Sequence, residues 1–453
     1  GVGIVQPRGD DGGPTDEQPI GTADQRAAFT KAAQAVQERR GKLQSQIAAI
    51  ENEFRLLSKA GPSQDIIKLI RSDGARVLGQ MKYAEWETLT FELNESRKAE
   101  KMPKIDMALC VTESGPRAPE TFVMLRGNPH VKGDKVEPAF PTIFNLPEPK
   151  LPEPAPSAKT SGRRSLLADW IAAPDNALTA RVFVNRLWQH HFGRGIVRSP
   201  NDFGTQGIRP THPELLDWLA SEFVDKGWRM KALHRLILTS NTYQMSSHGN
   251  PAALKVDPTN DLFWRFDMRR LTGEEIRDSI LAVSGNLNLK MYGPGVYPEI
   301  PREVLEGQSR PGQGWPKSSP EEAARRSVYI HVKRSLLYPI LESFDLAEPD
   351  RSTPVRFSTT QPTQALGMLN GQFLNKQAGI FAERLQKEAG NDVTQQVRLA
   401  LNLVTQRPPN PEDVQRGVRL IEALQREESL TTEAALRMYC LVVLNLNEFV
   451  YVD

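Results

Sequence analysis

The sequence contains very little cysteine. Cys110 and Cys440 are its two cysteines, and they lie far apart in a chain of 453 residues. So few cysteines exclude a disulfide scaffold, a zinc finger and an iron–sulfur cluster. A single bridge between them stays open as an alternative, but the sequence favours two buried free thiols.

An excess of one charge is also missing. Lys and Arg total 57 against 55 Asp and Glu, which leaves a formal net charge of +2. This balance does not support general nucleic-acid binding, which needs a concentrated basic face. No apolar run approaches the roughly eighteen residues of a membrane span, so we predict no membrane span. With 39% hydrophobic and 25% charged residues, the chain is a globular protein of two to four domains.

Familiar catalytic patterns are absent as well. The sequence has no G-x-S-x-G, no phosphate loop, no H-E-x-x-H and no C-x-x-C-H, which argues against the chemistries those motifs support. His190 and His191 are adjacent in a predicted helix, so their side chains point about 100° apart and do not share a metal ion. We expect His191 to be packed and hydrogen-bonded. We predict no metal site and no cofactor, and no catalytic residue can be assigned.

What the sequence does have is helical periodicity. After a flexible lead-in at residues 1–21, apolar residues from Phe29 to Leu57 recur at alternating spacings of three and four. This spacing predicts a coiled-coil-like helix that ends at Gly61-Pro62, and a second helix over 65–101 folds back on it. We therefore expect a helical-hairpin arm over 22–102. A partner-binding coiled coil is the alternative.

A small β element is predicted at 103–144. Residues 107–111 and 121–125 are both strand-like, and the glycine and prolines between them suit a hairpin or a small sheet. A Pro-rich linker follows at 145–160, in which Leu-Pro-Glu-Pro occurs twice. Proline removes donors and fixes φ, so we expect an extended spacer there and place the main domain boundary in it.

The remaining residues, 161–453, predict a multi-helix C-terminal domain with a long irregular insertion at about 285–320. Capping boxes are predicted at Thr211 and Thr272, each with Glu three residues later. Residues 327–332 are β-like. Helical spacing favours core positions for Trp170, Trp188 and Trp218. The fold class is therefore mainly α.

One basic cluster is a candidate ligand site. Arg269 and Arg270 precede a capped helix, and Lys333 and Arg334 follow the β-like run. Paired arginines bind carboxylate, sulfate or phosphate with planar donors. Trp315, in a Gly-rich loop, is the best candidate for an exposed contact residue. The favoured alternative is that nearby carboxylates pair with these cations internally.

Several long motifs carry a family resemblance. They are LTARVFVNRLW at 178–188, FGRGIV at 192–197, HPELLDWLA at 212–220, RRLT at 269–272, RSVY at 326–329, STTQP at 358–362 and LNLNEFVYVD at 444–453. Together they resemble a family of domains of unknown function that is expanded in planctomycetes and related bacteria. The resemblance covers about 160–453, and more loosely 103–144.

The resemblance implies a bacterial, extracytoplasmic protein. In that family the domain is usually the C-terminal domain of a large secreted protein, which often carries a planctomycete-type cytochrome c haem domain upstream. No catalytic residues are established that could be carried over to this chain. An association with the breakdown of complex, often sulfated, polysaccharides has been suspected for such proteins. Because residue 1 is Gly and no signal peptide follows, we expect a fragment or a processed product.

Three functions stay open at this point. The leading hypothesis is a non-catalytic assembly or interaction module of a secreted multidomain protein, with a protein partner or other domains of the same polypeptide. The second is an enzyme or binder acting on an anionic polysaccharide. The third is an accessory domain that docks a c-type cytochrome.

Overall fold

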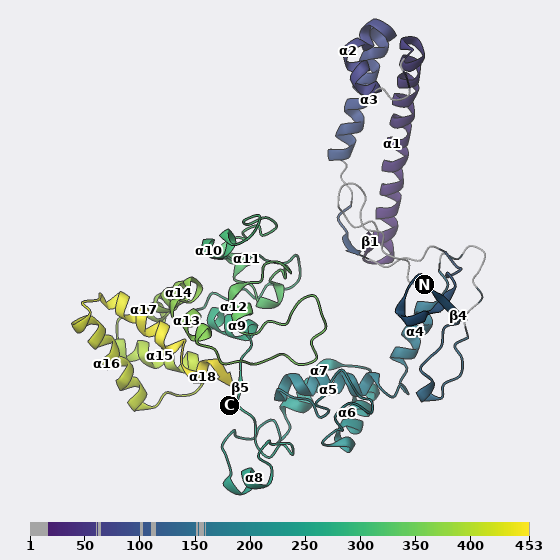
Figure 1. The fold of residues 1–453 in the computed structure, drawn as a ribbon. Coiled ribbons are helices and arrows are strands. Elements are labelled where there is room, and N and C mark those ends of the chain that lie inside the picture. The colour runs from purple at the N-terminus through teal and green to yellow at the C-terminus, as the bar shows by residue number, and fades with distance from the viewer. Residues whose placement is uncertain are drawn as a thin grey trace. The chain divides into compact units, whose positions relative to one another are not determined.

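The computed structural model describes residues 17–59, 61, 65–99, 103–109, 115–150, 153, 158 and 160–452. It is 55% helix and 6% strand, which confirms the mainly α class. The chain forms two compact units, Gly1–Trp170 and Ile171–Asp453 (Figure 1). The five-part domain division stays a prediction.

The first unit contains the helical arm. Helix α1 (Ala23–Ser58) begins with a capping box between Thr22 and Gln25 and packs against α2 (Ile66–Leu78) and α3 (Gln80–Ala99). Helix α3 runs antiparallel to α1, because Trp86 Nε1 donates to Glu51 at 3.3 Å near one end. Arg40 Nη2 donates to the Ser96 carbonyl at 2.7 Å nearer the other end.

The arm differs from the prediction in its second half. Where one helix was expected, two helices meet at Gly79, whose positive φ of 82° ends α2. Because the chain turns at this glycine, α2 and α3 both contact α1. The arm core consists of Ile47, Ile50, Phe54, Ile70 and Trp86. The predicted apolar stripe therefore holds as far as Phe54, but its last member, Leu57, is exposed.

The two predicted strands exist but do not pair with each other. Strand β2 (Asp106–Leu109) pairs with β1 (Glu17–Ile20). Strand β3 (Thr121–Met124) pairs with β4 (Lys132–Val136) across the 3-10 turn η1 (Leu125–Gly127). The two strands therefore form neither the expected hairpin nor one small sheet, because β3 pairs with β4, which follows it in the chain.

The first unit ends on an aromatic contact. After η2 (Thr142–Phe144), the described linker residues adopt neither helix nor strand. Trp170, in α4 (Arg163–Ala172), stacks on Phe140 at a centroid distance of 5.0 Å. Trp170 thus packs on an aromatic neighbour, as predicted, but it is only half-buried.

The second unit opens with a group of three helices. They are α5 (Thr179–Phe192), α6 (Pro213–Asp225) and α7 (Met230–Leu238), followed by the short α8 (Pro251–Val256). Val184, Trp188, Phe223 and Ile237 are among the buried residues of their core. Trp188 is buried as predicted.

Two expectations for α6 are wrong. Its N-cap is His212, without a side-chain cap, because the Thr211 N–H donates to the Ile196 carbonyl at 3.0 Å instead. Trp218 is 51% exposed. The buried face of α6 passes through Leu219, and the preceding residue lies about 100° around the helix from it.

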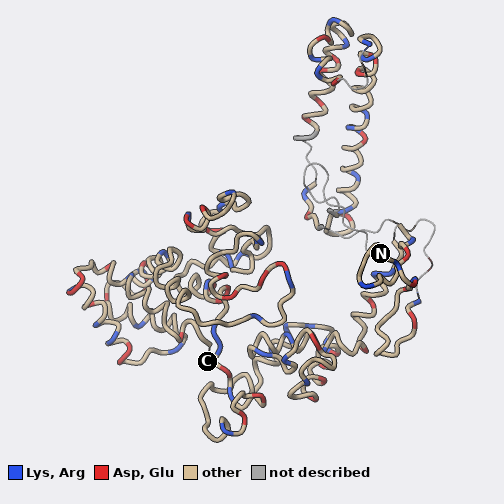
Figure 2. Tube along the Cα trace, viewed as in Figure 1, with Lys and Arg blue, Asp and Glu red and all other residues tan. Residues whose placement is uncertain are grey.

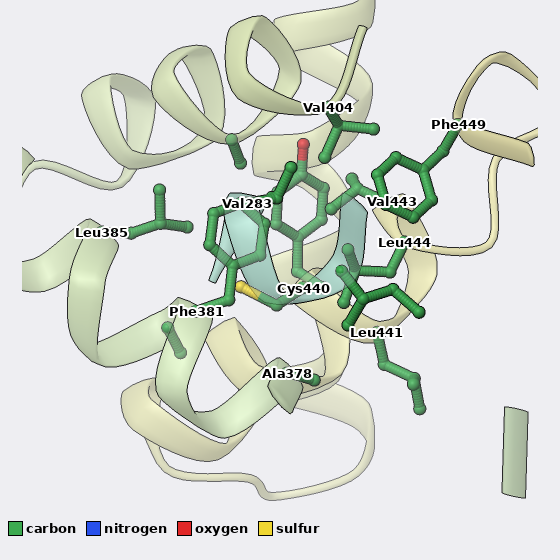
Figure 3. Close-up of a cluster of buried hydrophobic side chains, with 14 of the residues drawn as sticks. Val283, Ala378, Phe381, Leu385, Val404, Cys440, Leu441, Val443, Leu444 and Phe449 are labelled. Carbon is green, nitrogen blue, oxygen red and sulfur yellow. The ribbon is translucent and has the colours of Figure 1, made fainter. Parts of the chain in front are cut away.

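The rest of the second unit forms a larger helical core (Figure 3). Its helices are α9 (Gly273–Val283), α12 (Pro339–Ser343), α13 (Pro362–Asn370), α14 (Gln372–Ala389), α15 (Val393–Thr405), α16 (Pro411–Glu427), α17 (Thr432–Val443) and α18 (Asn447–Val450). Phe381 and Leu385 of α14 lie beside Cys440 of α17 in this core. Cys440 is a buried free thiol, and burial raises its pKa, which confirms the prediction for this cysteine. Cys110 lies outside the described residues.

A two-stranded ribbon joins distant parts of the second unit. Strand β5 (Arg269–Arg270) pairs antiparallel with β6 (Tyr451–Val452), directly before α9. The irregular insertion carries only the short α10 (Arg302–Glu306) and α11 (Pro320–Ala323). The β-like run at 327–332 is only partly β-like: residues Ser327–Tyr329 form the 3-10 turn η3, and Ile330 makes an isolated parallel bridge with Val296.

Residues of both charges are interspersed along both units (Figure 2). None of the described helices is both long and apolar enough to cross a membrane.

The packing of α16 yields a stability prediction. A Cβ added at Gly417 would lie 2.6 Å from Val397 Cγ1 and 2.8 Å from the Tyr439 hydroxyl. We expect Gly417→Ala to lower the free energy of unfolding by about 1–3 kcal/mol, through overpacking. Gly379→Ala is the matched control, since its nearest neighbour lies at 4.0 Å. Urea denaturation measures both, and equal effects of the two changes would contradict the packing argument.

Candidate functional site

Most charged side chains at the start of α9 are bound to partners within the second unit. Arg269 forms a bidentate pair with Glu275, with Nη1–Oε2 at 3.3 Å and Nη2–Oε1 at 3.2 Å. Glu275 also completes the predicted capping box with Thr272. Burial raises the pKa of Glu275, but the bonds from Arg269 and the Thr272 backbone outweigh it and hold the pKa below its usual range.

Arg270 makes a largely buried ion pair with Asp345. Its Nη2 lies 2.7 Å from Asp345 Oδ2, and its side chain is 7% exposed. It also donates to the carbonyl of Thr359. Asp345 accepts further hydrogen bonds from the Thr359 N–H at 2.9 Å and the Thr359 hydroxyl at 2.8 Å. Burial raises the pKa of Asp345, but these bonds outweigh it and lower the pKa.

This pair also holds a strained backbone in place. Asp345 has a φ of 63°, a left-handed conformation that non-glycine residues rarely adopt. Gln364 Nε2 donates to the neighbouring Ser343 carbonyl at 3.0 Å. The motifs RRLT and STTQP therefore meet at Asp345 in one hydrogen-bonded network.

The next charged residues of α9 extend the network. Glu274 binds Arg356 through two bonds of 2.8 and 2.9 Å. Asp278 accepts the Ser327 N–H at 2.7 Å. Arg277 is buried, and its Nη1 donates to the Arg325 carbonyl at 3.0 Å. These bonds tie α9 to the segment that follows the irregular insertion and to Arg356. The charged groups at the start of α9 are thus paired internally, which is the alternative to a ligand site.

The five predicted ligand residues are not brought together in one pocket. Arg269 and Arg270 bind carboxylates of the network, while Lys333 donates to the Gln313 carbonyl and Arg334 is exposed. Trp315 is 7% exposed, and its indole N–H donates to the Pro298 carbonyl at 2.9 Å. The expectation of an exposed Trp315 is wrong, because the ring fills a small core of the insertion.

A cavity that the sequence did not reveal lies in the same unit. It has a volume of about 450 Å³, and its walls come from α9, α12, α13, α14 and the insertion. Ile340, Phe344 and Phe373 supply apolar surface, while Lys317 and Lys376 are among its charged lining residues. These residues come from five separate segments without a shared spacing, so no sequence pattern marks them.

A histidine pair connects α5 and α7. His191 Nε2 lies 2.8 Å from His234 Nδ1, and Tyr243 packs edge-on against His191 at 5.7 Å. Burial lowers the pKa of His191, and the nearby His234, Arg269 and His190 lower it further. His191 is thus packed and hydrogen-bonded, as predicted. Among the residues that the structure describes, no three His, Cys, Asp or Glu side chains are grouped to hold a metal ion.

These features define a helical domain whose motif residues form an internal ion-pair network beside a cavity. Residues 163–421 match a family model described as PSD1, protein of unknown function (DUF1553). The chain belongs to this PSD1 family. No curated protein and no solved structure matches it.

The network makes a prediction about stability. We expect Arg270→Ala to lower the free energy of unfolding by about 3–5 kcal/mol, because it leaves the buried Asp345 carboxylate unpaired. Arg269→Ala, which removes a more exposed pair, should cost about 1 kcal/mol. Exposed Arg334→Ala is the control, with a change within about 0.5 kcal/mol. Chemical denaturation checks this order, and a larger loss for Arg269→Ala would contradict it.

The histidine pair predicts a pH dependence. Since the folded-state pKa of His191 is lowered, the unfolded chain binds this proton more readily, and stability falls as the pH drops below about 6.5. We expect His191→Gln to lose less of its thermal midpoint between pH 7.5 and 5.5 than the parent. His130→Gln, at an exposed position of the first unit, should behave as the parent does. Equal losses in His191→Gln and the parent would refute the assignment.

Proposed function

We propose that this chain is a non-catalytic assembly and interaction module of a secreted, multidomain bacterial protein. The observation that carries the proposal is the apolar surface at one end of the arm. Leu56 of α1 is 81% exposed and Met81 of α3 is 88% exposed. Large apolar side chains gathered on one exposed surface are typical of an interaction site.

The helix pairing brings these side chains to the same end of the arm. Lys82 and Glu53 form an ion pair between α3 and α1. Leu56 follows Glu53 by about one helical turn, and Met81 directly precedes Lys82. Exposed Leu57 belongs to the same end of α1.

The simplest partner of this surface is a second copy of the chain. Glu53 and Lys82 neutralise each other beside the apolar side chains, so this pair does not repel a second copy. A two-fold axis would pack the apolar side chains of the two copies against each other. Self-association at this surface would gather several copies of the larger protein.

The second unit supports the same proposal. A polysaccharide site at Arg269 and Arg270 is not favoured, because carboxylates already occupy both guanidinium groups. Loss of those carboxylate bonds would have to precede any ligand contact. The extracytoplasmic address is part of the proposal and rests on the resemblance alone.

Sedimentation equilibrium of the full chain between 1 and 100 µM tests the proposal. We expect the parent to self-associate and the double variant Leu56→Lys, Met81→Lys to shift the dissociation constant by on the order of tenfold or more, because buried charge opposes packing. The double variant Gln34→Lys, Gln46→Lys adds the same charge at exposed positions of α1 and should associate as the parent does. A parent that stays monomeric throughout would overturn the proposal.

A further inference from the structure

The cavity of the second unit has the dimensions of a small-molecule site. Its volume of about 450 Å³ lies within the range of about 300–1,000 Å³ that ligand pockets occupy. Apolar side chains form much of its wall, including Ile340, Phe344, Met368, Phe373 and Ile380. A ligand that enters it therefore buries an apolar body.

The charged residues of the wall are mainly cations. Arg277, Lys317 and Lys376 line the cavity, and Glu299 is the only acidic residue beside them in the described lining. Glu299 Oε1 lies 2.8 Å from Lys317 Nζ. The hydrogen bond from Lys317 lowers the pKa of Glu299, and the charge of Lys376 lowers it further. The Glu299 carboxylate thus offsets only one of the two lysine charges, and the lining keeps a net positive charge.

Deeper in the wall the positive charge is also incompletely balanced. The Arg277 guanidinium donates to the Arg325 carbonyl and the Ser327 hydroxyl, and these partners are neutral. Its Nη1 lies 3.8 Å from the Asp278 carboxylate, which Arg326 and the Ser327 N–H also share. A buried cation of this kind favours an anion in the adjoining cavity.

A buried amide adds a polar contact. Gln377 lines the cavity and is 3% exposed. Ser284 donates to its Oε1 at 2.8 Å. An amide N–H₂ in such a position is a donor for a ligand oxygen.

From these features we propose that the cavity binds a small amphipathic anion, with a medium-chain or aromatic body and a single carboxylate or sulfonate group. The body packs against Phe344 and Phe373, and Lys317 and Lys376 attract the anionic group. This site is separate from the arm surface, and it holds whether or not the chain self-associates.

Gly367 is a position at the cavity wall where a larger side chain can be added without a clash at its Cβ. It lines the cavity on α13, and a Cβ added there meets no atom within 4 Å. Leucine at this position projects into open space, and replacing a helical glycine favours the helix. Gly41 of α1 likewise has no atom within 4 Å of an added Cβ, so Gly41→Leu is the matched control in the other unit.

The experiment follows the fluorescence of 8-anilinonaphthalene-1-sulfonate with the full chain. We expect saturable binding at one site per chain, loss of that binding in Gly367→Leu with an unchanged or higher thermal midpoint, and parental binding in Gly41→Leu. The double variant Lys317→Gln, Lys376→Gln should weaken binding on the order of fivefold, while exposed Lys387→Gln should not. Absence of saturable binding, or equal binding by Gly367→Leu, overturns the site.

Competition then tests the charge of the ligand. Decanoate should displace the fluorophore from the parent at concentrations well below those of decanol or decyltrimethylammonium. The advantage of decanoate should shrink in the double lysine variant. Equal displacement by all three compounds would overturn the assignment of an anionic ligand.

Discussion

The pairing of Arg270 with Asp345 is the interaction on which the second unit depends. It joins the strand before α9 to the end of α12, and Thr359 extends it to the segment before α13. A buried ion pair of this kind is costly to break, because removal of one partner leaves the other charge without solvent or counterion. Three segments far apart in the sequence are thereby fixed around one carboxylate.

The same network explains the arrangement of the cavity. Ser343 and Phe344 directly precede Asp345 in sequence and also line the cavity. The hydrogen bonds that hold Asp345 in its left-handed conformation therefore also position these two residues of the cavity wall. Arg277 donates to the Arg325 carbonyl and so connects α9 to the segment whose Ala323 and Ala324 also line the cavity. Rigid walls of this kind keep a cavity open in the absence of a ligand, which reduces the ordering cost of binding.

Local signals in the sequence predicted local structure well. The capping box at Thr272, the stripe from Leu43 to Phe54 and the burial of Cys440 follow from spacing and side-chain type, and the structure confirms them. Predictions failed where tertiary contacts decide. The Ile196 carbonyl accepts a hydrogen bond from the Thr211 N–H, which is therefore not used to cap α6. Trp315 is buried in a small core together with Val296 and Tyr297. Neither partner lies near enough in sequence to be read from a pattern, and the same holds for the walls of the cavity.

The pairing of β5 with β6 bears on the order of folding. Arg269 lies opposite Val452 in this ribbon, so closing it requires a loop that contains α9 and α12 to α18. Contacts of such large sequence separation form late, because the entropy of loop closure must be overcome first. During synthesis the strand at Arg269 emerges long before its partner, and α5 to α7 can pack into their own core in the meantime. The start of α9 is therefore completed only when the last strand of the unit has left the ribosome.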